Sequence, residues 1–223
     1  MNSFSFEQIG DDSEFPDFPP YEMNGGSIVA IAGKKFVVIA ADMFLSSAYT
    51  DPPKLFKLAS RTVLGSTGSW GDTRAITRLL DMHIQIYELT HLRRIPADEV
   101  ALMLHKIMYN CRFLPYGITN VVAGMEKSGK GAIFSYDPVG NYKREIYCAR
   151  GGAEPWLQVE LESKIGLANL DTFRTKLTKD EAVSAALESF IAASKTIHIG
   201  NSIAINVITK NGVEAKQVVL RKS

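Results

Sequence analysis

The sequence predicts an α+β domain in which helices cover two mostly antiparallel sheets packed face to face. Short apolar segments rich in β-branched residues recur through the chain, and glycine-containing turns join them. Two blocks between these segments have apolar residues at intervals of three and four, as on one face of a helix. With 223 residues and 46% hydrophobic composition, the chain can bury a substantial core as one domain.

The N-terminal segment differs in composition from the rest of the chain. Residues 1–23 contain six acidic residues, no Lys or Arg, and prolines at positions 16, 19 and 20. Such a segment cannot bury enough apolar surface to offset the entropy lost on ordering. We expect a tail or a removable pro-segment.

The first half of the domain is expected to contain two strand pairs and a helical hairpin. Strands are predicted at 28–32, 36–42, 54–58 and 62–68, with a loop at 43–53. A helix is predicted over 69–91 from its helical spacing of apolar residues. A second helix should begin near Pro96 and be stopped by Pro115. Its apolar stripe comprises Val100, Leu104, Ile107, Met108 and Cys111.

The second half repeats this order. Strands are predicted at 119–125, 131–136 and 143–149, followed by a short helix at 153–163. Thr178 and Glu181 have the spacing of a capping box that opens a longer helix. Strands at 203–209 and 213–220, joined at Asn211-Gly212, form the last predicted hairpin.

Charge and cysteine content limit the environment of the protein. The net charge of +1 gives no general attraction to nucleic acid or to an anionic membrane, so neither is expected as a partner. Cys111 and Cys148 have no close cysteine partner, which suits a reducing compartment. The longest apolar stretch is too short to span a bilayer, and the N-terminus lacks the features of a secretory signal. We therefore expect a soluble intracellular protein.

Metal and cofactor motifs are not recognisable in the sequence. The four histidines lack the neighbours and spacing of a metal site. Gly65, Gly68 and Gly71 fit no nucleotide fingerprint and favour a tight turn between strand and helix. We expect no metal and no cofactor. Ser27, Asp42 and Lys54 have the chemistry of an activated nucleophile, although Asp and Lys beside a hairpin are also common without catalysis.

Several motifs nevertheless resemble those of the β-type subunits of the 20S proteasome, which have the N-terminal nucleophile hydrolase fold. They are residues 24–33 (Asn-Gly-Gly-Ser-Ile-Val-Ala-Ile-Ala-Gly), 39–42, 63–68 with 71–72, 112–116 (Arg-Phe-Leu-Pro-Tyr) and 129–140. The last two, with residues 219–222, most resemble the sixth eukaryotic β type, which is non-catalytic. The resemblance implies a four-layer αββα sandwich over 17–223, with 1–16 as an acidic tail or pro-segment.

The resemblance also assigns positions to the family's catalytic groups. Active members use an N-terminal threonine whose own α-amine is the general base, aided by a Lys, an Asp and a glycine N–H for the oxyanion. The matching positions here are Gly26, Asp42, Lys54 and Gly68. Gly26 has no hydroxyl, so the constellation is vestigial. Further departures are Gly-Gly-Ala at 151–153, Thr196 in place of an Asp, Ile199 in place of a Ser, and Phe44 in place of an Arg.

The implied function is that of a structural subunit. Its expected partners are other β subunits in a seven-membered ring, the α ring and the opposite β ring. Protein substrates, including ubiquitinated ones, are expected to meet the chain only inside the proteolytic chamber. The resemblance further implies a location in cytoplasm and nucleus, trimming near Asp17, and a role for Glu126 in the substrate pocket of the neighbouring chymotrypsin-like subunit.

Alternatives remain open. Cleavage between Gly26 and Ser27 would free a serine nucleophile and make the chain an active N-terminal serine hydrolase. Glu126 could equally be a solvated carboxylate in a turn. A stand-alone protease of bacterial type is disfavoured by the acidic N-terminal segment and by the block from 112 to 140.

Overall fold

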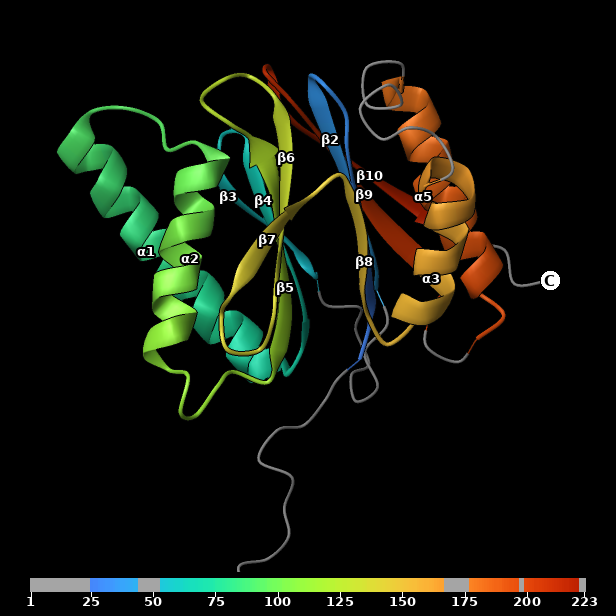
Figure 1. Ribbon diagram of the computed structural model, residues 1–223, viewed down its shortest axis with the longest axis horizontal. Helices are drawn as coiled ribbons and strands as arrows, with labels where there is room; N and C mark the ends of the chain where they lie inside the picture. The colour runs from blue at the N-terminus through green and yellow to red at the C-terminus, as the bar shows by residue number, and fades with distance from the viewer. Residues whose placement is uncertain (1–24, 44–52, 167–176, 197–198, 221–223) are drawn as a thin grey trace, which may run out of the picture.

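Two five-stranded antiparallel sheets form the centre of the protein (Figure 1). The computed structural model describes residues 25–43, 53–166, 177–196 and 199–220. The first sheet has the order β10 (Gly212–Val219), β9 (Ser202–Thr209), β2 (Phe36–Asp42), β1 (Ser27–Ala32), β8 (Tyr147–Gly151). The second has the order β3 (Leu55–Ala59), β4 (Thr62–Gly68), β5 (Ile118–Met125), β6 (Gly131–Tyr136), β7 (Tyr142–Glu145).

Helices cover the outer face of each sheet (Figure 1). Helices α1 (Trp70–His91) and α2 (Ala97–Asn110) lie on the second sheet. Helix α3 (Glu154–Leu161), which continues as the π-helical turn η1 (Glu162–Gly166), and α5 (Lys179–Ala193) lie on the first. The predicted four-layer αββα sandwich is therefore confirmed. No helix within the described ranges has both the length and the apolarity needed to cross a bilayer.

The central strands are apolar on both faces because each face meets another layer. Every residue of β1 and β2 is buried. Val29 and Ile31 belong to the cluster formed with α3 and α5, whereas Ile28 and Ala30 belong to the cluster between the sheets. Strand β1 thus has apolar contacts on both faces, and its ends are the places where polar groups can be held.

The helix boundaries follow from local hydrogen bonds. The Ser69 hydroxyl caps α1 by accepting from the Asp72 N–H. The predicted capping box of α5 is confirmed, since Thr178 accepts from the Glu181 N–H and the Glu181 carboxylate accepts from the Thr178 N–H. Each of these bonds satisfies an N–H group that has no partner inside the helix.

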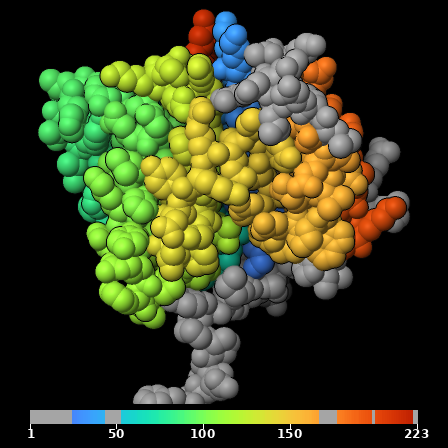
Figure 2. Space-filling model, in the orientation of Figure 1, coloured from blue at the N-terminus to red at the C-terminus, as the bar shows by residue number. Residues whose placement is uncertain are grey.

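Two predicted elements differ in the structure. The single strand predicted at 143–149 is wrong: β7 ends at Glu145 in the second sheet, and β8 begins at Tyr147 in the first. This segment, yellow in Figure 2, lies on the surface where the two halves of the molecule join. Hydrophobic pattern alone does not say which sheet a residue pairs with, so it could not reveal the crossing.

Helix α2 also ends earlier than predicted. It stops at Asn110, before Pro115, and Cys111 lies at the C-cap, where its N–H donates to the Met108 and Tyr109 carbonyls. Consecutive turns fill residues 111–114. The helix 153–163 similarly begins at Glu154 and becomes π-helical at Glu162. The final hairpin is confirmed, with Gly212 as the first residue of the returning strand.

Candidate functional site

A buried ion pair joins the end of β2 to the residue that precedes β3, next to the start of β1. Asp42 is the last residue of β2 and is 1% exposed, while Lys54 precedes β3 and is 5% exposed. The Lys54 Nζ lies 3.5 Å from Asp42 Oδ1 and donates to the Asp42 main-chain oxygen at 3.1 Å. Two of the residues assigned from the sequence are therefore in contact.

The Asp42 carboxylate has further hydrogen bonds from the backbone. The Ser27 N–H donates to Asp42 Oδ1 at 2.7 Å, and the Gly200 N–H donates to Oδ2 at 3.3 Å. A buried carboxylate is costly unless it is paired and hydrogen-bonded, and this one is both. Asp42 thereby connects β1, β2 and the segment before β9, which is a structural role independent of catalysis.

Gly26 lies directly beside Lys54. A Cβ atom built on Gly26 would lie 2.0 Å from Lys54 Cε and 2.7 Å from Nζ, far inside van der Waals contact. Gly26 also has φ +100°, where L-residues are strained. The Lys54 side chain thus occupies the volume that a nucleophile side chain at this position would need.

Ser27 is held as a structural residue. It is fully buried, pairs with Gly151 across the β1–β8 ladder, and its Oγ accepts from the Ala153 N–H at 2.8 Å. The Gly152 N–H donates to the Gly26 carbonyl at 2.9 Å. The Ser27 hydroxyl therefore holds the entrance to α3 against the start of β1. The Gly-Gly-Ala at 151–153 is visible in the sequence, but no local pattern indicates this hydrogen bond.

Gly68 lies at the end of β4, on the same side of the molecule. Its φ is +112°, and a Cβ there would lie 2.4 Å from the Gly117 carbonyl, so glycine is required for close approach of the chain. Two residues earlier, the Ser66 N–H donates to the Lys54 carbonyl at 2.9 Å. Strand β4 therefore brings Gly68 to the vicinity of Lys54. The three atoms nearest to a Cβ at Gly68 are backbone atoms of Gly117 and Ile118.

Of the other two predicted residues, Glu126 lies in the described ranges, away from this cluster. Glu126 is in the turn after β5, where it forms a 2.7 Å ion pair with Arg144 and accepts from the Ser128 hydroxyl. This turn adjoins the hairpin between β1 and β2, since the Gly131 N–H donates to the Lys34 carbonyl. Glu126 is thus at the opposite end of the sheets from Asp42. Asp17, and with it the boundary between 16 and 17, lies outside the described residues.

The charged groups of the cluster are already bonded to one another. Within the described ranges, no group of three His, Cys, Asp or Glu side chains is placed to hold a metal ion. The site brings together one carboxylate, one ammonium group and two backbone donors, all of which are already bonded to one another. The Asp42–Lys54 pair contributes to the stability of the fold, because removing one partner of a buried ion pair typically costs about 3–5 kcal/mol.

Two face-to-face antiparallel sheets between helix layers, with an Asp–Lys pair where the first strand begins, define the N-terminal nucleophile hydrolase fold. Comparison with known proteins gives the family. The sequence profile described as "Proteasome subunit" matches residues 22–208. The chain belongs to the proteasome subunit family.

The relatives that match are named as β subunits. Proteasome subunit beta type-1 of Drosophila melanogaster is 47% identical, with 100% of both chains covered. Proteasome subunit beta type-1 of Danio rerio is 36% identical over 92% of this chain and 89% of its own length. Proteasome subunit beta type-6 of Saccharomyces cerevisiae is 29% identical over 92% of this chain and 91% of its own length.

Proposed function

We propose that this chain is a non-catalytic β subunit of the proteasome, equivalent to the subunits named beta type-1 in animals and beta type-6 in yeast. The observation that carries the proposal is Gly26, which has no hydroxyl and whose missing side-chain volume is filled by Lys54. The chain would contribute to the wall of the proteolytic chamber without cleaving peptide bonds.

The chemistry of active members explains why a chain with Gly26 in place of the threonine would have no cleavage activity. Their mechanism, as the family resemblance gives it, needs a hydroxyl and a free α-amine on the same first residue. Here the carbonyl of Gly26 is bonded to the Gly152 N–H, and the next N–H, that of Ser27, is bonded to Asp42. Both groups at this junction serve as ordinary backbone partners within the first sheet.

The partners and location follow from the same proposal. Membership of the family implies assembly with other proteasome subunits. We place the chain in a seven-membered β ring between an α ring and the opposite β ring, with protein substrates meeting it only inside the chamber. We place the particle in cytoplasm and nucleus.

The direct test is to purify the particle from cells that express a tagged form of the chain. An electrophilic peptide probe that acylates an N-terminal nucleophile should label the active β subunits in that particle and leave this chain unlabelled. N-terminal sequencing should find a first residue upstream of Gly26, near Asp17. Covalent labelling of this chain would overturn the non-catalytic assignment.

The competing function is an active serine hydrolase formed by cleavage between Gly26 and Ser27. The position of the Ser27 nitrogen beside Asp42 is its best support, because a freed amine would lie next to a carboxylate. Against it, the Ser27 side chain is fully buried and its Oγ is engaged by Ala153. A mature N-terminus at Ser27 would establish the competing function.

The proposed role of Glu126 in a neighbour's substrate pocket needs its own measurement. Its carboxylate is held by Arg144, so part of its charge is compensated within this chain. In particles with Glu126→Ala, the cleavage preference of the adjacent chymotrypsin-like site should change; an unchanged preference would leave Glu126 as the partner of Arg144 only.

A further inference from the structure

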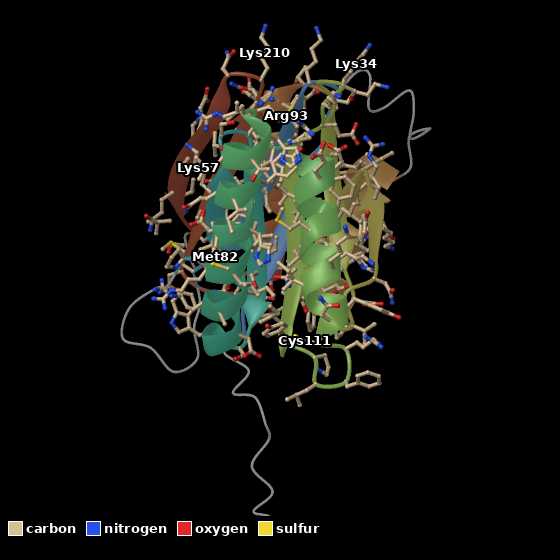
Figure 3. The ribbon with its side chains drawn as sticks, turned by 90° about the vertical axis from the view of Figure 1, so that its left-hand side faces the viewer. Lys34, Lys57, Met82, Arg93, Cys111 and Lys210 are labelled. Atoms are coloured by element: carbon tan, nitrogen blue, oxygen red, sulfur yellow. The ribbon has the colours of Figure 1, made fainter. Side chains whose placement is uncertain are left out.

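An exposed protrusion at the end of α2 is not accounted for by the vestigial site. It consists of Tyr109, Arg112, Phe113 and Leu114, which we call the 109–114 knob. Phe113 is 87% exposed, Leu114 75% and Tyr109 44%. Figure 3 shows the segment beyond Cys111 projecting from the end of the helix layer. Apolar side chains this exposed, and adjacent in one loop, commonly mark an interaction site.

The side chains of the knob are arranged before any partner binds. The Arg112 guanidinium lies 4.5 Å from the centre of the Tyr109 ring and 4.4 Å from that of Phe113, so it is stacked against both rings. Its Nη1 also donates to the Tyr109 carbonyl at 3.1 Å. A cation stacked on two aromatic faces is favourable, and a fixed arrangement lowers the entropy lost on binding.

The backbone of the knob is fixed at both ends. On the helix side, the Arg112 N–H donates to the Tyr109 carbonyl and the Leu114 N–H to that of Cys111. On the strand side, the Gly117 N–H donates to Asp72 at 2.8 Å, and the Gly117 carbonyl accepts from the Ser69 N–H at 2.8 Å. These bonds anchor the knob to the start of α1 and hold its side chains outward.

The charge of the knob indicates the chemistry of its partner. Among the ion pairs of the described residues, none involves Arg112. The same is true of Arg61, Arg74 and Arg78, whereas Arg93, Arg94, Arg144 and Arg150 are each paired with a glutamate. A surface that covers the knob would bury this guanidinium, and burial without an opposite charge is costly. The partner should therefore offer an apolar hollow for Phe113 and Leu114 and a carboxylate for Arg112.

The size of the knob argues that its partner is held by other contacts as well. Four side chains of this kind bury on the order of 400–600 Å², which is less than the roughly 800 Å² per partner of a stable two-chain interface. A second copy of this chain would not be held by the knob alone. A subunit fixed alongside in a multi-subunit particle meets this requirement.

We propose that the 109–114 knob inserts into an apolar, carboxylate-bearing hollow on another subunit of the proteasome and contributes to fixing this chain in its place. The proposal rests on the function proposed above, because it needs a particle that contains the chain. Tyr and Arg are among the residue types that most often dominate the energy of such contacts.

Photo-crosslinking in the assembled particle tests the contact directly. Phe113 is replaced by benzoyl-phenylalanine, which keeps an apolar ring, and the crosslinked peptides are identified by mass spectrometry. The expected product joins position 113 to a different subunit, at a peptide that contains Asp or Glu. Crosslinks only to residues 1–24 of the same chain, only to a second copy, or to no protein at all would overturn the proposal.

Competition for assembly tests the energetic role. Cells express the tagged variant beside the untagged wild-type chain, and native mass spectrometry counts both in the purified particle. Phe113→Ala and Arg112→Glu should each enter about tenfold less than wild type, as for loss of a hot-spot side chain. Phe113→Tyr should enter normally and Arg112→Lys at an intermediate level, because Lys keeps the charge and loses the planar stack. Equal entry of all four variants would contradict the role of the knob.

The two proposals fail in different ways. If the tagged wild-type chain is absent from purified particles, the proposed function fails. If the wild-type chain is present but position 113 does not crosslink to another subunit, only the inference about the knob fails.

Discussion

At the scale of single residues, the absence of a side chain at Gly26 leaves the space that the Lys54 side chain fills. The positive φ of Gly26 and the 2.0 Å overlap predicted for a Cβ act independently. Restoring a hydroxyl at position 26 would therefore also require moving Lys54, and moving Lys54 would disturb its bond to Asp42. The space beside Gly26 is consequently packed by Lys54 rather than empty.

Two alanine variants separate these two effects. Gly26→Ala should destabilise the chain more than Gly129→Ala, because Gly129 also has positive φ, +76°, but has open space where its Cβ would lie. The strained backbone costs about 1–2 kcal/mol in both variants, and overpacking adds about 1–3 kcal/mol at position 26 only. Chemical denaturation of the two variants measures the difference. Equal destabilisation would show that Lys54 moves aside without cost.

The two cysteines should react differently with a thiol reagent. Cys148 is fully buried, and burial raises the pKa of its thiol to about 12. The folded state therefore keeps the neutral thiol as the pH rises through 9, where an unfolded thiol ionises, and it loses stability between that pH and about 12. Alkylation followed by mass spectrometry at pH 8 should modify the partly exposed Cys111 first and Cys148 only on unfolding. Equal alkylation rates would contradict this.

At the scale of elements, the capping box fixes where α5 begins. The Thr178 backbone N–H and side chain, bonded to Glu181, lower the pKa of the Glu181 carboxyl. This contribution to stability is present above the pKa of the unfolded carboxyl and is lost as the pH falls through the folded value. The capping box lies at the exposed start of α5, which covers β2. Its effect on stability is therefore local to that helix layer.

Removing the cap should produce a small, specific loss. Thr178→Ala is expected to lower the free energy of unfolding by about 1 kcal/mol, because the Glu181 N–H loses its partner. Thr178→Ser keeps the hydroxyl and should retain most of the stability. Thermal unfolding at pH 7 compares the two, and a similar loss in both variants would assign the effect to the Thr178 methyl group instead.

At the scale of the whole molecule, the backbones of the two halves come into close contact beside the first hairpin. A Cβ on Gly131, at the start of β6, would lie 2.2 Å from the Phe36 carbonyl and 2.7 Å from that of Gly33. Both obstacles are backbone atoms of the other sheet, so no side-chain rotation can relieve the overlap. The position of one sheet on the other therefore depends on the absence of a side chain at Gly131.

Gly131→Ala should accordingly disturb sheet packing. We expect a loss of about 1–3 kcal/mol or more in the free energy of unfolding, since the sheets must move apart. The control is Gly71→Ala in the first turn of α1, where the nearest atom is 3.9 Å away, so the added methyl should not destabilise the protein. Denaturant titration compares the two variants. Stabilisation by Gly131→Ala would refute the close approach.

Local sequence patterns predict most of the strands and helices. The apolar run at 36–42 gave a strand with the predicted bounds, as did 62–68 and 131–136, because these residues are buried on both faces and alternate between two clusters. The Thr178–Glu181 spacing gave a helix start, since a capping box depends only on residues three apart. Gly26, Asp42, Lys54 and Gly68 are assigned from motifs, and the structure places the first three together.

Features that depend on which segments meet become visible only in the folded protein. The crossing from β7 to β8 between Glu145 and Tyr147 depends on pairing with β6 and β1, and β1 is far away in the chain. No local sequence pattern therefore predicts the crossing. The filling of the Gly26 volume by Lys54 and the bond from Ala153 to Ser27 depend on three-dimensional proximity in the same way. Sequence predicts which backbone each segment prefers, whereas folding decides what lies within a few ångströms of it.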